Sequence, residues 1–113
     1  MPILKITIPS KKSQEFQKDL LEITEESLKG IFQVTQDQIT TMVTLADAQD
    51  QEQSQTVNTA IVIEIIAYRG RDFSIKQQLF QTIYEKLNKL YTIEKKELII
   101  YLVEIEKENY FAS

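Results

Sequence analysis

The sequence contains no cysteine and no histidine among its 113 residues, no tryptophan, and only two glycines and two prolines. The missing residue types exclude disulfides, thiolate nucleophiles, an imidazole base and the usual zinc ligands. Any catalysis must therefore use carboxylates, amines, hydroxyls or guanidinium groups. We expect no metal and no organic cofactor.

Positive charge is also scarce, because 13 lysines and arginines face 17 acidic residues and the net charge is −4. This balance favours neither nucleic acid nor an anionic membrane as a partner. The chain opens directly into a strand-like run over residues 3–8, without the pattern of a signal peptide, and has no run long enough to span a bilayer. The expected location is the cytoplasm.

Two halves of the chain repeat each other at a shift of 59 positions. When residues 2–46 are aligned with residues 61–105, apolar positions match apolar positions; Leu4 aligns with Ile63, for example, and Leu20 with Leu79. The length and the hydrophobic fraction of 42% suit one globular core. We therefore expect a single domain over residues 1–113, built from two copies of one unit.

Each copy reads as strand, helix and strand. The strand-like runs cover residues 3–8, 39–45, 61–67 and 98–105, and Ser13 and Asp72 are suited to cap the two helices. Apolar stripes at helical spacing follow the caps: Phe16, Leu20, Ile23, Ser27 and Ile31 in the first copy, and Ile75, Leu79, Ile83, Leu87 and Leu90 in the second. The fold class is therefore α+β with two layers, in which two tandem β-α-β units form a four-stranded mixed sheet with both helices on one face.

The segment between the copies, residues 47–58, is acidic, rich in glutamine and almost without apolar residues. Its composition predicts a mobile linker. A lid or a partner-binding segment is the alternative interpretation.

The strands at 61–67 and 98–103 are apolar on both alternating faces. Two helices can cover only one face of a four-stranded sheet. Another copy of the chain would bury the other face, so we expect a homo-oligomer.

The two arginines of the chain, Arg69 and Arg71, both lie where the third strand ends and the second helix begins. A guanidinium group binds a carboxylate through two parallel hydrogen bonds, so two of them at a strand end form a plausible carboxylate clamp. Gly70 between them keeps the bend narrow. The alternative is a strand-to-helix turn with two solvated arginines and Asp72 as its helix cap.

Pro2 directly follows the initiator methionine. Removal of Met1 would turn its nitrogen into a secondary amine, and a terminal amine titrates about a unit above neutrality. Burial or a neighbouring arginine lowers the pKa of such an amine, whereas a carboxylate raises it, so Pro2 could act as a general base or a general acid. The alternative is a proline that only begins an edge strand.

These features together resemble the tautomerase superfamily, which includes 4-oxalocrotonate tautomerase and macrophage migration inhibitory factor. The resemblance rests on Pro2 opening a strand, on the doubled β-α-β unit and on the turn from Tyr68 to Lys76, and it covers essentially the full length. It is greatest for the malonate semialdehyde decarboxylase branch, from which the chain departs where Tyr110 replaces a tryptophan and no glycine-rich tail follows.

The resemblance implies a homotrimer and a small carboxylate substrate. If these residues have the roles of the matching positions in that family, Arg69 and Arg71 would hold the carboxylate and polarise the adjacent carbonyl. Pro2 would then exchange the proton at carbon. Asp37, in the loop after the first helix, would orient the substrate or activate a water; otherwise it is an ordinary loop acid. Positive charge beside a developing enolate and a proton carrier with a near-neutral pKa suit that chemistry.

The leading hypothesis is therefore an isomerase or lyase that moves or removes a proton next to a carbonyl, by keto–enol tautomerisation or by decarboxylation of a 3-oxo acid. Two other functions compete with it. One is a non-catalytic oligomeric binding module that uses residues 47–58 as its contact surface. The other is a ferredoxin-like regulatory domain, which we expect to pair its strands antiparallel across the repeat and to give Pro2 no role.

Overall fold

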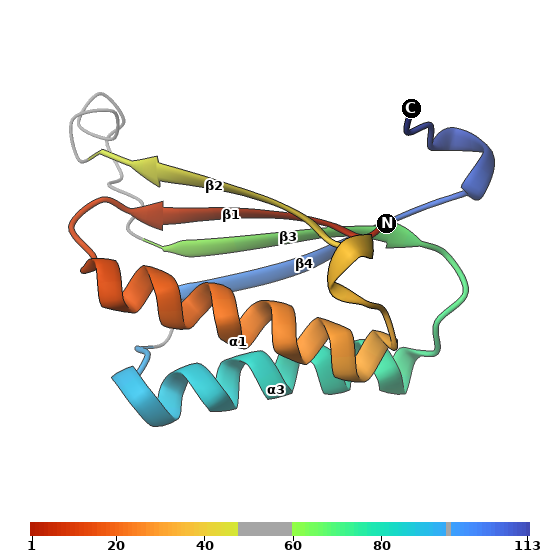
Figure 1. Ribbon diagram of the computed structural model, residues 1–113. Helices are drawn as coiled ribbons and strands as arrows, with labels where there is room; N and C mark the ends of the chain where they lie inside the picture. Colours follow the sequence, from red (N-terminus) through yellow and green to blue (C-terminus); the bar gives the residue numbers. More distant parts are fainter. Residues whose placement is uncertain (48–59, 95) are drawn as a thin grey trace.

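The structure is a computed structural model that describes residues 1–47, 60–94 and 96–113 (Figure 1). Apart from Asp47, the predicted linker lies outside the described residues. In chain order the elements are β1 (Ile3–Pro9), α1 (Gln14–Phe32), the 3-10 helix η1 (Gln36–Gln38), β2 (Thr40–Ala46), β3 (Ile61–Tyr68), α3 (Phe73–Tyr91), β4 (Leu98–Ile105) and the 3-10 helix η2 (Lys107–Asn109).

The four strands form one mixed sheet in the order β2-β1-β3-β4. Strands β1 and β2 are parallel, as are β3 and β4, while β1 and β3 pair antiparallel where the two units meet. Both helices cover the same face (Figure 1). The predicted architecture of two β-α-β units in two layers is confirmed.

The ferredoxin-like alternative is wrong. The two strands of each unit here are direct neighbours, whereas a ferredoxin-like fold splits each unit by placing another strand between them. Antiparallel pairing across the repeat, which we expected of that fold, occurs in this sheet as well and does not separate the two.

The two helices begin and end 59 residues apart, and their ends have matching backbone conformations. Residues Ser13 and Asp72 occupy the N-cap positions, and Ser13 Oγ accepts a hydrogen bond of 3.0 Å from Phe16 N, whereas Asp72 makes no such bond. The C-cap residues Gln33 and Thr92 both adopt the left-handed conformation, with φ of 56° and 52°. The repeat therefore extends to the geometry with which each helix stops.

The core lies between the helices and the sheet. Its fully buried side chains alternate along β1 and β3 and recur at helical spacing along α1 and α3; they include Leu4, Ile6, Ile8, Leu20, Leu28, Ile61, Ile63, Ile65, Leu79, Ile83 and Leu87. One stripe residue is predicted wrongly, because Leu90 is 60% exposed. The inward face of α3 continues at steps of four from Leu87 to Tyr91, which turns Leu90 outward.

Among the described residues, no helix covers the opposite face of the sheet. Four of its exposed large side chains are Met42 on β2 and Ile99, Tyr101 and Val103 on β4. A polar row crosses this face, since Lys5 Nζ lies 3.8 Å from a Glu64 oxygen and the Tyr101 hydroxyl donates to the same carboxylate. That hydrogen bond raises the pKa of Tyr101.

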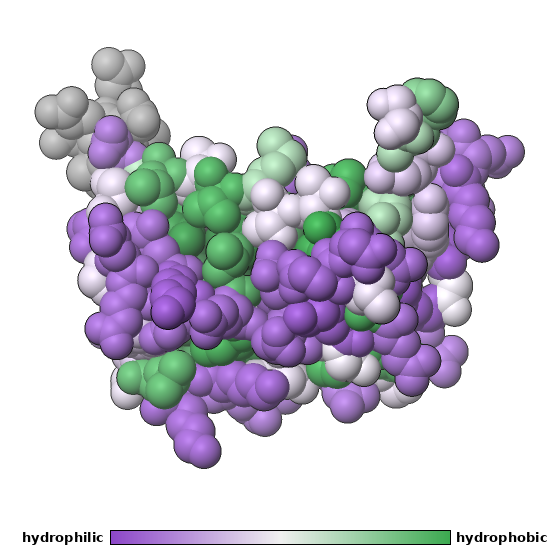
Figure 2. Space-filling model, in the orientation of Figure 1, coloured by the Kyte–Doolittle hydropathy of each residue, from purple (hydrophilic) through white to green (hydrophobic). Residues whose placement is uncertain are grey.

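Strand β2 also leaves apolar residues exposed on the helix side of the sheet. The register aligns Val43 and Leu45 with the buried Ile6 and Ile8, yet they are 45% and 50% exposed because they lie at the edge of the sheet. Figure 2 shows apolar side chains gathered over β1 and β2, above a polar band over the helices. Both edge strands, β2 and β4, thus present apolar surface to solvent.

Candidate functional site

Four candidate residues lie at one end of the sheet, where β1 and β2 begin and β3 and β4 end (Figure 1). The same end receives the C-terminus of α1 and the N-terminus of α3. Because β1 and β3 run antiparallel with Ile3 opposite Ile66, Pro2 lies beside the end of β3, two residues before Arg69. The topology therefore brings the start of the chain next to the arginine turn.

Pro2 is buried, and its neighbours are fixed by backbone hydrogen bonds. Its carbonyl oxygen accepts a hydrogen bond of 3.1 Å from Thr40 N, which joins the start of β1 to the start of β2. The terminal ammonium group of Met1 donates to the carbonyl oxygen of Gln38 at 2.9 Å. The beginning of the chain is thus anchored to η1 and to β2.

Asp37 lies in the middle of η1 and is exposed. The Thr35 hydroxyl donates to the Asp37 carboxylate, and Thr35 N donates to Gln38 Oε1 at 2.9 Å. These bonds order the short turn that carries Asp37. The structure therefore places Asp37 one residue from the carbonyl group that receives the chain's terminal ammonium, with its carboxylate held by Thr35.

Arg71 turns toward the end of α1. Its guanidinium group stacks 4.1 Å from the centre of the Phe32 ring and donates to the carbonyl oxygens of Tyr68 at 3.3 Å and Phe32 at 3.5 Å. Burial lowers the pKa of Arg71, and the nearby Glu104 carboxylate opposes this shift. Arg71 therefore ties the last residue of α1 to the turn after β3.

Glu104 is itself part of this packing. One of its oxygens accepts a hydrogen bond of 2.7 Å from Lys76 on α3, and the other oxygen is buried with no hydrogen-bond partner among the described residues. The charges of Lys76 and Arg71 stabilise the carboxylate in this position.

Arg69 points the other way, toward the C-terminal segment. It is exposed, and its Nε lies 2.7 Å from a carboxylate oxygen of Glu106. Beside the pair is an open hollow of about 410 Å³, lined by Tyr68, Arg69, Ile105, Glu106, Lys107 and Glu108. The two arginines of the predicted clamp thus contact different elements, and of the two it is Arg69 that lines the hollow.

The C-terminal segment is held against this hollow by aromatic contacts. The ring of Tyr110 packs edge-on against Tyr68 at a centroid distance of 6.0 Å, and Lys107 Nζ lies 5.9 Å from the centre of the Tyr68 ring. Phe111 is 88% exposed. Tyr110 therefore anchors the segment.

Glu106 is the contact that sequence reasoning missed. It directly follows β4, as Arg69 directly follows β3, and the parallel register pairs Tyr68 with Ile105. The register of the two neighbouring strands was the signal that would have found it.

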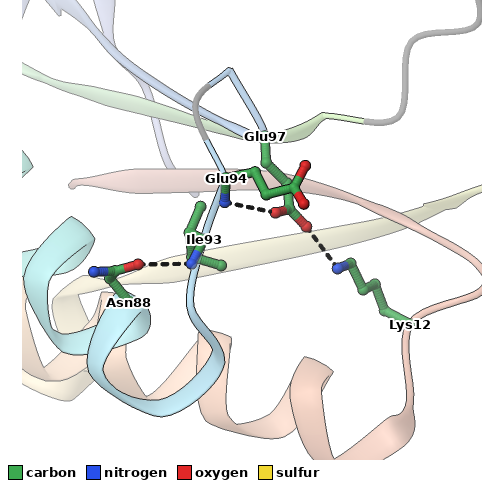
Figure 3. A network of polar contacts seen from close by, with 5 residues as sticks. All are labelled: Lys12, Asn88, Ile93, Glu94 and Glu97. Atoms are coloured by element: carbon green, nitrogen blue, oxygen red, sulfur yellow. Dashed lines mark hydrogen bonds and ion pairs between the residues drawn. The ribbon is translucent and has the colours of Figure 1, made fainter.

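A second hollow, of about 530 Å³, lies at the opposite end of the sheet between Lys11, Lys12, Tyr91, Thr92, Glu94, Lys96 and Glu97. Figure 3 shows polar contacts in and next to this hollow: Lys12 Nζ donates to Glu97 at 2.7 Å, Glu94 N donates to Glu97 at 3.0 Å, and Asn88 Oδ1 accepts from Ile93 N at 2.6 Å. These groups tie the loop before β4 to the start of α1. They order two loops, which is a structural role.

Tyr91 is one of the residues that line this second hollow. Its hydroxyl donates to Asp19, which raises the pKa of Tyr91 to about 12, and its ring packs edge-on against Phe16 at 4.8 Å. Within residues 1–47, 60–94 and 96–113, no three acidic side chains gather closely enough to hold a metal ion. In the same ranges no helix is long and apolar enough to cross a membrane.

Comparison with known families identifies the group to which the fold belongs. A family model described as tautomerase enzyme matches residues 49–111, which is more than half of the chain. The chain belongs to the tautomerase family. The resemblance predicted from Pro2, the doubled unit and the arginine turn is therefore confirmed at the level of the family.

Solved structures resemble the tautomerase-family chain over nearly its whole length. The FG41 malonate semialdehyde decarboxylase inhibited by 3-bromopropiolate is 16% identical, with a TM-score of 0.80 over 98% of this chain and 88% of that chain. A symmetric trimer of wild-type fused 4-OT is 15% identical, with a TM-score of 0.80 over 98% of this chain and 93% of that one.

The macrophage migration inhibitory factor-like protein from Entamoeba histolytica is 15% identical, with a TM-score of 0.74 over 99% of this chain and 95% of that chain. At these identities the likeness establishes the fold. Comparison with curated proteins gave no match.

Proposed function

We propose that the chain is a cofactor-independent enzyme that transfers a proton next to the carbonyl group of a small 2-oxo or 3-oxo carboxylate. The reaction is either keto–enol tautomerisation or a malonate semialdehyde-type decarboxylation. The proton carrier is the amine of Pro2, exposed when Met1 is removed. The observation that carries the proposal is that a buried Pro2 and an exposed Arg69 lie at the same end of the sheet.

The position of Pro2 suits a proton carrier. A terminal amine has an ordinary pKa of about 7.7–8.0, and burial lowers the pKa of an amine because it disfavours the charged form. Asp37, on the turn whose Gln38 carbonyl oxygen accepts from the chain's terminal ammonium, would orient the substrate or a water. In ketonisation the enol hydroxyl loses its proton and the amine delivers a proton to the α-carbon, and the reverse transfer forms the enol. In decarboxylation carbon dioxide leaves the α-carbon, and the protonated amine supplies the proton that replaces it.

The arginine turn supplies the positive charge. Arg69 is exposed at the hollow and suits the carboxylate of the substrate. Arg71 donates to backbone carbonyls and stacks on Phe32, so its charge lies fixed beside the site and favours the developing enolate.

We propose further that the enzyme works as a homotrimer. Exposed apolar residues on both edge strands and on the uncovered sheet face support association, and the solved fused 4-OT structure of the same fold is a symmetric trimer. Association would cover Met42, Ile99 and Val103.

The test compares the ketonisation rate of a simple enolised 2-oxo acid in the native chain and three variants. We expect Pro2→Ala to lose about 10²-fold or more, because its primary amine differs in pKa and in shape from the proline nitrogen. Arg69→Ala should raise KM more than it lowers kcat. Pro9→Ala is the matched control, since Pro9 is the other proline, buried at the far end of β1, and should retain the native rate.

Equal rates in the native chain, Pro2→Ala and Arg69→Ala would contradict the proposal. An intact mass of the purified protein accompanies the assay. If Met1 remains on the chain, the Pro2 nitrogen is an amide without basicity, and the mechanism fails.

A further inference from the structure

Arg69 already holds a carboxylate in the free protein. The bond between Arg69 Nε and Glu106 Oε1 is 2.7 Å long, while the two side chains are 67% and 52% exposed. A carboxylate ligand that approaches the Arg69 guanidinium group therefore finds its Nε already bound by the carboxylate of Glu106.

Contacts of the neighbouring residues fix the backbone position of Glu106 relative to Arg69. Arg69 N donates to the carbonyl oxygen of Ile105 at 3.0 Å, which continues the pairing of β3 and β4 past Tyr68. On the other side of Glu106, the Tyr110 ring packs on Tyr68 and holds the C-terminal segment in place. The backbone of Glu106 is therefore fixed on both sides, opposite Arg69.

The bond itself is easily exchanged. An ion pair between two exposed side chains is nearly balanced by hydration and by side-chain entropy, so its net stability is small. The lining of the hollow contains two cations, Arg69 and Lys107, and two anions, Glu106 and Glu108. A carboxylate that binds the Nε edge of Arg69 thus has to replace one weakly held anion.

We propose that Glu106 is an internal competitor that occupies Arg69 until a carboxylate ligand displaces it, and that it thereby sets the affinity of the site. This inference rests on the proposed function for the class of ligand, a small carboxylate. Glu106 acts through Arg69 and does not touch the reacting atoms. It is a residue that determines affinity, supplied by the strand next to the one that carries the arginine.

The experiment uses the nitrogen-15 NMR signals of the arginine Nε groups. The chain has only two arginines, so the spectrum contains two such signals, and Arg69→Lys assigns them. Pyruvate is titrated into the full chain and into Glu106→Gln, and the Kd is taken from the shift of the Arg69 signal.

We expect Glu106→Gln to shift the Arg69 signal of the free protein and to bind pyruvate about twofold more tightly, which is the affinity that a weak exposed ion pair can withhold. Glu108→Gln removes the same charge from the same hollow without removing a contact to Arg69. We expect Glu108→Gln to change the Kd by less than about 1.5-fold. The two variants together distinguish direct competition for Arg69 from the loss of one negative charge in the hollow.

An unchanged or weaker affinity in Glu106→Gln overturns the inference, because Glu106 then only orients Arg69 or does nothing to it. If pyruvate shifts the Arg69 signal in neither protein, both the inference and the proposed role of Arg69 fail. If Glu106→Gln binds more tightly but the native chain ketonises no 2-oxo acid, the inference stands and the proposed function falls.

Discussion

The two ends of the sheet carry ion pairs of the same length in very different surroundings. At the end away from Pro2, Lys12 and Glu97 approach to 2.7 Å with 23% and 22% of their side chains exposed. At the Pro2 end, Arg69 and Glu106 also approach to 2.7 Å, but 67% and 52% of their side chains are exposed.

Further contacts increase this difference. Glu97 also accepts a hydrogen bond from Glu94 N, and Lys12 Nζ lies 4.8 Å from the centre of the Phe16 ring. Distance alone therefore does not tell a structural ion pair from an exchangeable one. The number of further contacts and the access of water decide which role each pair can have.

Loss of the Lys12–Glu97 pair should have the largest effect on stability. Glu97→Gln leaves the Lys12 ammonium partly buried without a counter-charge, and we expect it to lower the free energy of unfolding by about 1–2 kcal/mol. Urea denaturation at pH 7 measures this, with Glu15→Gln on the exposed first turn of α1 as the control. A loss no greater than that of the control would show that the far-end pair is no stronger than a surface pair.

Acid provides a second check on this pair. The hydrogen bond from Lys12, followed by the one from Glu94 N, lowers the pKa of Glu97. A lowered folded-state pKa contributes stability above the unfolded value, about 4.3, and that contribution is lost as the pH falls through the folded value. The difference between the native chain and Glu97→Gln should therefore shrink below about pH 4.3.

The two arginines extend the comparison to a single turn. Arg71→Lys keeps the charge but loses the flat stacking on Phe32 and one of two carbonyl contacts, and we expect it to lower the free energy of unfolding by about 1 kcal/mol. Arg69→Lys is the matched control and should cost less than about 0.5 kcal/mol. Equal losses in thermal or urea denaturation would mean that the two arginines are held alike.

The sequence was sufficient for the fold because the repeat, the two hydrophobic periods and the helix caps all agreed. Residues such as Ser13 and Leu20 indicated the same helix through independent signals, and the structure has that helix. Leu90 was assigned wrongly because a stripe allows a step of three or four, and only packing decides between them.

The candidate site was less predictable. The sequence could place Pro2, Asp37 and both arginines at the ends of elements, and the topology brings those ends together. It could not show that Arg71 turns to Phe32 while Arg69 turns to Glu106. These directions depend on the register of β3 against β4 and on the path of the chain after β4, which involve residues far apart in the sequence.

The smallest expected effect completes the comparison of the two ion pairs. Glu106→Gln should change the free energy of unfolding by less than about 0.5 kcal/mol, because both side chains are solvated with or without the pair. Urea denaturation at low and high salt measures it; the native chain and the variant should converge as salt screens the charges. A loss above about 1 kcal/mol that persists in high salt would make this pair a structural tie like Lys12–Glu97. A carboxylate ligand would then have to break part of the fold to reach Arg69, which is the opposite of an exchangeable contact.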